Sequence, residues 1–284
     1  ATVAALDAFL PFDEALVTRL ADDLRAAGVR FVLCDISPLG IAVARAAGLP
    51  SVLIENFTWD WIYRGYEPRP AELESHIDRM RNLFESADHR IQTRPVCDPR
   101  PSSLTTSPIC REPRMHSELV RRRLGIASDK PSVLLTMGGI PGSYDFLDRL
   151  ARDDRLHTVA PGTCEGRMVR DGHLIRLAHH GEFFHPDLVA AVDVVVGKLG
   201  YSTVAEAFHG GRAFAWVGRP DFRESPVLAR FVGEEMPSVE LSQRDFSSGD
   251  WIDKALALAT RATPRQQRSN GANEAAEYLC SLLD

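Results

Sequence analysis

The chain has 284 residues, with 44% hydrophobic and 25% charged residues and a formal net charge of −6 at pH 7. This length and composition favour two globular domains, and the acidic balance argues against nonspecific binding to nucleic acid. No window approaches about 18 continuous apolar residues, so no transmembrane span is predicted. The five cysteines are widely spaced and form no Cys-x-x-Cys pair, which favours reduced thiols in a cytoplasm over a zinc ribbon or a disulfide framework.

The first part of the chain predicts a parallel α/β sheet. The elements expected there are helices over residues 1–10, 14–27 and 38–47 and strands over residues 31–35 and 51–54. Strands that alternate with helices form βαβ units, whose strands pair in parallel. The first domain is therefore expected to be Rossmann-like.

An aromatic-rich stretch, ENFTWDWIYRGY over residues 55–66, follows the second of these strands. We expect it to be a loop at the carboxyl end of the strand, where open α/β sheets bind ligands. Aromatic faces stack on sugar rings, so Trp59 and Trp61 are candidate acceptor-binding residues, with Asn56 and Asp60 as polar contacts. The alternative is that the aromatic side chains pack between the domains.

A change of composition then marks the domain boundary. A helix over 71–87 and a strand over 88–93 are followed by residues 94–114, whose five prolines and several Ser/Thr residues are typical of a linker. We place the boundary near residue 112, which gives domains over residues 1–112 and 113–284.

The second domain is predicted to open with a helix over 115–125 and a strand over 132–137. Gly138 and Gly139 follow that strand directly, and glycines at such a turn let the backbone approach a ligand closely. A plain strand-to-helix turn is the alternative.

The stretch LIRLAHHGEFFHP, residues 174–186, is expected to be a loop before a helix over 187–192. Its histidines raise the question of a metal site, but adjacent His side chains diverge and no carboxylate falls at a usual ligand spacing. No metal is therefore expected, and His179 is a candidate contact to a phosphate or a sugar hydroxyl.

The most informative stretch is VDVVVGKLGYSTVAEAFHGGRAFAWVGRPDFRE, residues 192–224. A buried β-branched strand precedes Gly197 and Gly200, and Ser202 and Thr203 are predicted N-caps of the helix that follows. Because a helix N-terminus presents N–H groups and a partial positive charge, this turn predicts a phosphate site. An ordinary capped crossover is the alternative.

This stretch resembles the donor-nucleotide motif of two-domain, GT-B-type glycosyltransferases, of the family 28 and UDP-glycosyltransferase-like groups. On the plant-type run His-Cys-Gly-x-Asn-Ser-x-x-Glu, Lys198 takes the place of the His, Gly200 the Gly, Ser202 the Asn, Thr203 the Ser and Glu206 the Glu. The resemblance implies that Gly200, Ser202 and Thr203 hold the diphosphate and that Glu206 accepts hydrogen bonds from the ribose hydroxyls. Lys198 departs from the His but can neutralise a phosphate as a point charge.

The resemblance also assigns neighbouring segments to the donor. It implies that the Gly138-Gly139 loop approaches the donor phosphates and that the loop around His179 holds the base. In the loop over 219–226 it implies sugar contacts, for which Asp221, Arg223 and Glu224 are candidates. A solvated charged loop that merely starts a helix is the alternative for these three residues.

For catalysis, the resemblance points to Asp35. Plant-type glucosyltransferases deprotonate the acceptor with a His that an Asp orients, and Asp35 matches that Asp. No partner His is identified, because none precedes His76. The N-terminal domain is expected to lack its first βα units relative to these enzymes. A helix-start residue at a strand end is the alternative for Asp35.

A second resemblance lies in the aromatic stretch, which is similar to the transferase-like N-terminal region of bacterial L-arabinokinase-like proteins. The final helix, expected over residues 273–283, is implied by the GT-B fold to cross back onto the first domain.

Together these features predict a cytoplasmic α/β enzyme of two Rossmann-like domains that moves a sugar from a nucleotide-sugar to an acceptor. The donor is expected to be UDP-linked, the reaction inverting, the acceptor a small molecule or lipid-linked, and no cofactor is expected. Three alternatives stay open: a hydrolase or epimerase on the same scaffold, a noncatalytic sugar-nucleotide-binding or regulatory protein, and a dinucleotide dehydrogenase. The last is disfavoured, because no Gly-x-Gly-x-x-Gly with a downstream acid follows any strand.

Overall fold

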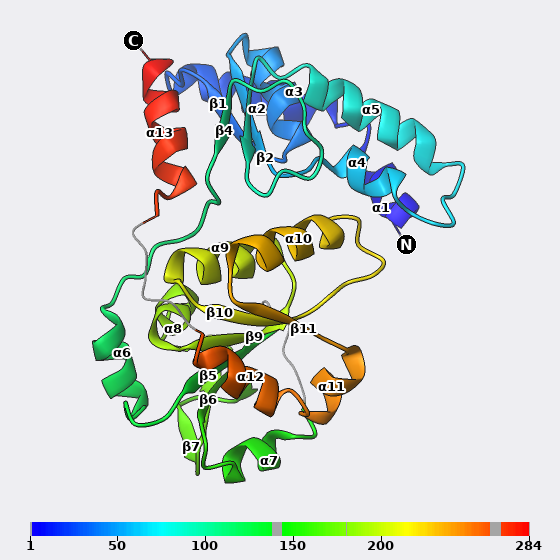
Figure 1. Ribbon diagram of the computed structural model, residues 1–284. Helices are drawn as coiled ribbons and strands as arrows, with labels where there is room; N and C mark the ends of the chain where they lie inside the picture. Colours follow the sequence, from blue (N-terminus) through cyan, green and yellow to red (C-terminus); the bar gives the residue numbers. More distant parts are fainter. Residues whose placement is uncertain (1, 138–143, 180, 262–267, 284) are drawn as a thin grey trace. The chain divides into compact units, whose positions relative to one another are not determined.

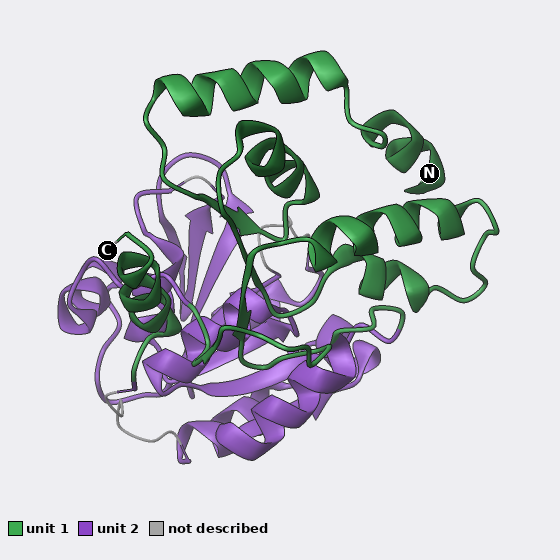
Figure 2. Ribbon diagram, turned by 90° about the horizontal axis from the view of Figure 1, so that it is seen from above, with its two compact units in different colours: residues 1–109, 221–224, 269–284 green, residues 110–220, 225–268 purple. Residues whose placement is uncertain are grey.

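The computed structural model describes residues 2–137, 144–179, 181–261 and 268–283, which form two compact α/β units. Unit 1 comprises residues 1–109, 221–224 and 269–284, and unit 2 comprises residues 110–220 and 225–268 (Figure 2). The α/β fold class predicted from the sequence is confirmed. The chain first passes from unit 1 to unit 2 between residues 109 and 110, and the boundary predicted from the sequence lies near residue 112.

Within the residues described, unit 1 has a parallel sheet in the order β1-β2-β3-β4. Figure 1 labels β1, β2 and β4 of this sheet and shows α13 in red. Its strands are β1 (Val32–Asp35), β2 (Ser51–Glu55), β3 (His89–Thr93) and β4 (Leu104–Thr106). Its helices are α1 (Thr2–Phe9), α2 (Glu14–Ala26), α3 (Pro38–Ala47), α4 (Trp59–Arg64), α5 (Leu73–Glu85) and α13 (Gly271–Ser281). The final helix, for which the sequence predicts a return onto the first domain, belongs to unit 1.

Both faces of the unit 1 sheet are covered. On one face Leu53 packs in a cluster with Ile41 of α3 and with Ile77 and Met80 of α5. On the other face Val52 and Ile91 pack against the buried Ala275 of α13. The alternation of side chains along β2 therefore places successive residues in separate clusters.

Two expectations for unit 1 were wrong. The proline-rich segment is not wholly a linker, because its residues Leu104–Thr106 form β4, which pairs in parallel with β3. The aromatic stretch is not wholly a loop, because Trp59–Arg64 form α4. In that helix Trp59 stacks on Tyr63 with ring centroids 5.9 Å apart, which is the i, i+4 contact of a helical turn.

Unit 2 has a larger sheet in the order β11-β10-β9-β5-β6-β8-β7 among its described residues, parallel except for the β7–β8 pair. Its strands are β5 (Ser132–Thr136), β6 (His157–Cys164), β7 (Val169–Asp171), β8 (Leu174–Ala178), β9 (Val194–Lys198), β10 (Ala213–Val217) and β11 (Ser238–Leu241). Its helices are α6 (Ser117–Leu124), α7 (Leu147–Arg152), α8 (His185–Ala191), α9 (Tyr201–Gly210), α10 (Ser225–Glu235), α11 (Gln243–Ser248) and α12 (Ile252–Ala259). The predicted loop over 174–186 is corrected in part, because its first five residues are β8.

The central strands of unit 2 are buried on both faces. Val195 lies in a cluster with side chains of α8, α9 and α10, whereas Val194 and Val196 lie in a second cluster with side chains of α7, α11 and α12. This is the pattern that a continuous apolar strand in a parallel sheet predicts. Across the described part of the chain, no helix combines the length and the apolar character that crossing a bilayer would need.

Gly197 lets β9 approach β5, and we expect its replacement by Ala to destabilise unit 2. A Cβ at this position would lie 1.9 Å from the carbonyl oxygen of Thr136. We expect Gly197→Ala to cost about 1–3 kcal/mol of folding free energy, visible as a lower Tm. Gly233→Ala in α10 is the control: a Cβ there meets nothing within 4 Å, so the Tm should stay equal or rise. Equal melting of the Gly197 variant and the wild type would contradict this account.

Acidification should also destabilise unit 2 through His157. Burial, together with the positive charge of Arg170 and the neighbouring His173, lowers the pKa of His157. Below the unfolded pKa of about 6.5 the unfolded chain binds a proton that the folded chain refuses, so stability falls as the pH drops from that value. We expect the decrease of Tm between pH 8 and pH 5 to be smaller in His157→Gln, and unchanged in the exposed control His116→Gln.

Candidate functional site

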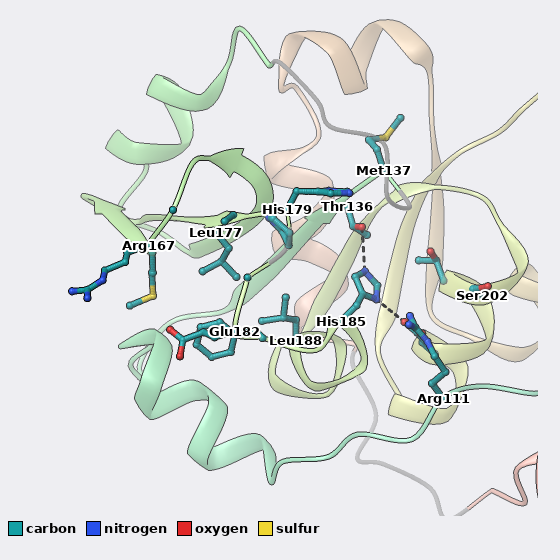
Figure 3. A pocket seen from close by; sticks show the side chains of 18 residues that line it. Arg111, Thr136, Met137, Arg167, Leu177, His179, Glu182, His185, Leu188 and Ser202 are labelled. Atoms are coloured by element: carbon teal, nitrogen blue, oxygen red, sulfur yellow. Dashed lines mark hydrogen bonds and ion pairs between the residues drawn. The ribbon is translucent and has the colours of Figure 1, made fainter.

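Unit 2 contains a cavity of about 1020 Å³ at the carboxyl ends of its strands. Thr136 and Met137 reach it from the end of β5, Leu177 from β8, and Ser202 from the start of α9 (Figure 3). Its apolar wall also includes Leu188 of α8. Carboxyl ends of parallel strands are where open α/β sheets bind ligands, so this cavity is the candidate site.

The first turn of α9 forms one side of the cavity. Its N-cap is Gly200, with no side-chain cap, so the prediction that Ser202 and Thr203 are N-caps is wrong. These two residues are instead the second and third residues of the helix, and both line the cavity. The helix N-terminus therefore presents hydroxyl groups beside the first backbone N–H groups, whose dipoles favour an anion.

Glu206, one turn farther along α9, is buried and lies in a polar network. Its Oε1 accepts hydrogen bonds from Nε and Nη2 of Arg111, at 3.2 and 2.9 Å. Its Oε2 lies 2.6 Å from Nδ1 of His185, and Nε2 of His185 lies 3.2 Å from Oγ1 of Thr136. In Figure 3 His185 stands between Thr136 and the ion pair that Arg111 makes. The network joins α9, α8, β5 and the segment that enters unit 2.

The segment with which the chain enters unit 2, residues 110–115, is held in place by Asp187, a buried residue of α8. Its Oδ1 accepts hydrogen bonds from the backbone N–H groups of Arg114 and Met115, at 2.6 and 3.0 Å. The guanidinium of Arg114 lies 4.0 Å from the ring centroid of Phe184, and that of Arg111 lies 5.0 Å from it. The backbone bonds and the ring contacts together fix the position from which Arg111 reaches the cavity.

Four of the predicted donor-binding residues line this cavity: His179, Ser202, Thr203 and Glu206. Gly200 lies next to it as the N-cap of α9, and Lys198 is half-buried at the end of β9. Gly138 and Gly139 lie outside the described residues. No set of three or more His, Cys, Asp or Glu residues among those described is arranged to hold a metal ion.

Arg111 and His185 were missed by the sequence analysis. Arg111 lies in the segment that its prolines made typical of a linker, and His185 was weighed as a metal ligand. The sequence signal for His185 was the proline that follows it, because a Pro in the first turn marks the start of a helix and so places His185 at that start.

The loop over residues 221–224 belongs to unit 1. Glu224 is buried there and accepts a hydrogen bond from Nδ2 of Asn56 at 2.9 Å. Arg223 donates from Nη1 to the carbonyl oxygen of Trp61 at 2.5 Å, and its Cζ lies 4.2 Å from the Trp61 ring centroid. Asp221 is exposed. Within unit 1, the structure thus joins two of the predicted donor residues, Arg223 and Glu224, to two of the predicted acceptor residues, Trp61 and Asn56.

The remaining predicted acceptor residues have partners inside unit 1. Asp60 is buried and pairs with Arg64 at 3.3 Å and with Arg81 at 3.9 Å. The Trp59 ring meets the edge of Phe57 with centroids 5.4 Å apart. These contacts show that the aromatic stretch packs within unit 1, whatever ligand it also contacts.

A buried polar cluster lies at the carboxyl ends of β2 and β3. Oε1 of Glu55 accepts hydrogen bonds from Gln92 at 2.9 Å and from Arg90 at 3.2 Å. Burial nevertheless raises the pKa of Glu55. Burial, together with the negative charges of Glu224 and Glu55, also raises the pKa of Cys97, so this thiol stays protonated at neutral pH.

Asp35 is exposed at the end of β1. The next residue, Ile36, has φ of 48°, a left-handed conformation that is strained for a β-branched residue. His76 does not serve Asp35, because its Nε2 lies 2.8 Å from Asp7. Asp35 as the catalytic residue remains a prediction.

Arg223 should anchor the loop over residues 221–224. Loss of its hydrogen bond and ring contact in Arg223→Gln is expected to cost about 1–2 kcal/mol of local stability, or roughly a 5–30-fold larger open population. Cleavage by chymotrypsin after Phe222 would then accelerate by a similar factor. Asp221→Asn, in the same loop, should leave the rate unchanged. Equal rates for both variants and the wild type would refute the anchoring role.

No protein-family model matches the chain. An L-arabinokinase of Arabidopsis thaliana is 29% identical over 258 residues, which cover 88% of this chain and 24% of that relative. Among solved structures, the glycosyltransferase VinC in complex with dTDP is 15% identical, with a TM-score of 0.57 over 95% of this chain and 76% of its own. Arabidopsis thaliana UGT89C1 complexed with UDP is 12% identical, with a TM-score of 0.58 over 94% and 78%. These likenesses show the fold, and the chain therefore has the GT-B-type fold that its sequence predicts.

Proposed function

We propose that the chain is a nucleotide-sugar-dependent glycosyltransferase whose unit 2 binds the donor. The observation that carries this proposal is the cavity at the start of α9, where a helix N-terminus, Ser202 and Thr203 meet an apolar wall. An apolar wall suits a base, and a helix N-terminus suits a diphosphate. Two solved structures of this fold are complexes with dTDP and with UDP, which supports a nucleotide as the ligand of this chain.

In this proposal the acceptor hydroxyl attacks the anomeric carbon and the nucleoside diphosphate leaves, with inversion. Negative charge grows on the leaving diphosphate, so N–H groups and cations that are already in place lower the barrier. The start of α9 supplies the N–H groups, and Lys198 and the cations of the cavity supply the charge. The acceptor, a small molecule or lipid-linked, gives up its proton to a base that Asp35 would orient. No cofactor is proposed, and the donor is proposed to be UDP-linked.

The L-arabinokinase relative favours a second candidate function. This chain spans 24% of that relative's length, so it matches one region of a longer protein that bears the name of a sugar kinase. The second candidate is therefore a sugar-nucleotide-binding region that acts with a sugar kinase without transferring a sugar. Both candidates require a nucleotide in unit 2, and they differ in whether a sugar is transferred.

We expect one nucleoside diphosphate to bind unit 2. Calorimetric titration with UDP, dTDP, GDP and CDP should show a clear preference for one of them, and we expect UDP to bind most tightly. Thr203→Val keeps the side-chain shape and removes the hydroxyl, so the loss of about one hydrogen bond should weaken binding roughly 5-fold. Thr260→Val, after α12 and away from the cavity, is the control. A folded protein that binds none of the four would refute both candidate functions.

Turnover then separates the candidates. With the UDP-sugars incubated alone, release of UDP and free sugar would identify a hydrolase, whereas conversion to another UDP-sugar would identify an epimerase. UDP release that requires an added acceptor supports the transferase. Tight binding with no turnover on a broad acceptor panel favours the noncatalytic role.

A further inference from the structure

Glu206 has little capacity left to read a ribose. Its side chain is 3% exposed, and a carboxylate offers about four acceptor positions. Two contacts from Arg111 occupy Oε1, and one contact from His185 occupies Oε2. At most one acceptor position therefore remains, whereas a ribose diol that binds through both hydroxyls needs two.

Arg111, in contrast, has hydrogen-bond donors left for a ligand. Its side chain is 59% exposed and lines the cavity, although its Nε and Nη2 are engaged by Glu206. A guanidinium has five N–H donors in a planar fork, so three donors are left over by these two hydrogen bonds. That planar fork suits the oxygens of a phosphate, which it can bind at two points.

The ion pair with Glu206 fixes the orientation of the Arg111 guanidinium. A buried ionised carboxylate needs a cationic partner, which Arg111 provides, and in return the guanidinium is fixed by two contacts. The ring of Phe184 and the two backbone hydrogen bonds to Asp187 restrict the same segment. A cation that is already oriented loses little conformational entropy when an anion binds.

We infer that Arg111 recognises the terminal phosphate of the nucleotide in this cavity and that Glu206 is its positioning residue, able to read at most one ribose hydroxyl. This inference rests on the proposed function. It changes the expected role of Glu206, because the resemblance alone implies a residue that serves the ribose hydroxyls.

The test compares nucleotides that differ by one phosphate. Arg111→Gln should lower the affinity for UDP ~10–100-fold, the range for one charge-assisted contact, and should lower the affinity for UMP less than ~3-fold. Arg122→Gln is the matched control: it removes the same charge from an exposed position on α6, outside the cavity, and should leave both affinities unchanged. If dTDP binds instead of UDP, the dTDP and dTMP pair replaces UDP and UMP.

A double-mutant cycle tests the positioning role. If Glu206 acts through Arg111, Glu206→Gln weakens UDP more than UMP, and the Arg111→Gln/Glu206→Gln double variant binds UDP no more weakly than Arg111→Gln. If Glu206 instead binds the ribose, Glu206→Gln lowers the affinity for UDP and for UMP by the same factor. In the double variant this loss of affinity then adds fully to the loss that Arg111→Gln causes. That result would overturn the inference. Circular dichroism checks that each variant is folded, and Arg111→Gln alone decides the phosphate contact if the buried Glu206 variant fails to fold.

The outcomes separate this inference from the function on which it rests. Binding of a nucleotide by the wild type with equal UDP affinity in Arg111→Gln refutes the role of Arg111 and leaves the donor site standing. Absence of any nucleotide binding by the folded wild type refutes both. The 2′-deoxy and 3′-deoxy analogues of UDP complete the test: a large loss of affinity with both analogues in the wild type, but not in Glu206→Gln, would show that Glu206 binds the whole diol and would overturn the inference.

Discussion

The candidate site of unit 2 depends on the close approach of two strand backbones. Gly197 of β9 pairs with Thr136 of β5, and the Thr136 carbonyl occupies the space that a Cβ would need. Because the strands can pair there, the end of β5 lies beside the turn that starts α9. Thr136 then reaches His185, and His185 reaches Glu206. The polar network of the cavity is thus set by backbone packing in the sheet beneath it.

Much of the fold could be predicted because its signals are local. Helix α3 has the bounds predicted from its sequence, since Pro38 marks its start and Gly48 its end. Strand β4 could not be predicted in the same way. It is a short strand in a proline-rich segment, and its pairing with β3 is a tertiary contact. The start of α9 was misplaced because cap propensity favours Ser and Thr, whereas Leu199 still bonds the neighbouring strand and the helix begins after Gly200.

The candidate site was predictable in part for the same reason. Ser202, Thr203 and Glu206 lie within one motif, and the structure brings them to one cavity together with the distant His179. Arg111 enters that cavity because Asp187, far along the chain, holds its segment by backbone amides, and no local pattern reveals such a contact. For Asn56 and Asp60 the residue types alone did not reveal their partners in the structure. Their residue types suit a sugar, but their partners are Glu224 and two arginines of the same unit.

Neither unit can be separated from the other by one cut in the chain. The chain passes between the units after residues 109, 220, 224 and 268, so neither unit is a continuous stretch. A fragment that ends at residue 109 would lose α13 and uncover the face of the sheet around Val52 and Ile91. It would also leave Asn56 without its carboxylate partner. A chimaera in which a foreign domain replaces unit 2 would therefore have to retain the native residues 221–224 and the C-terminal helix α13.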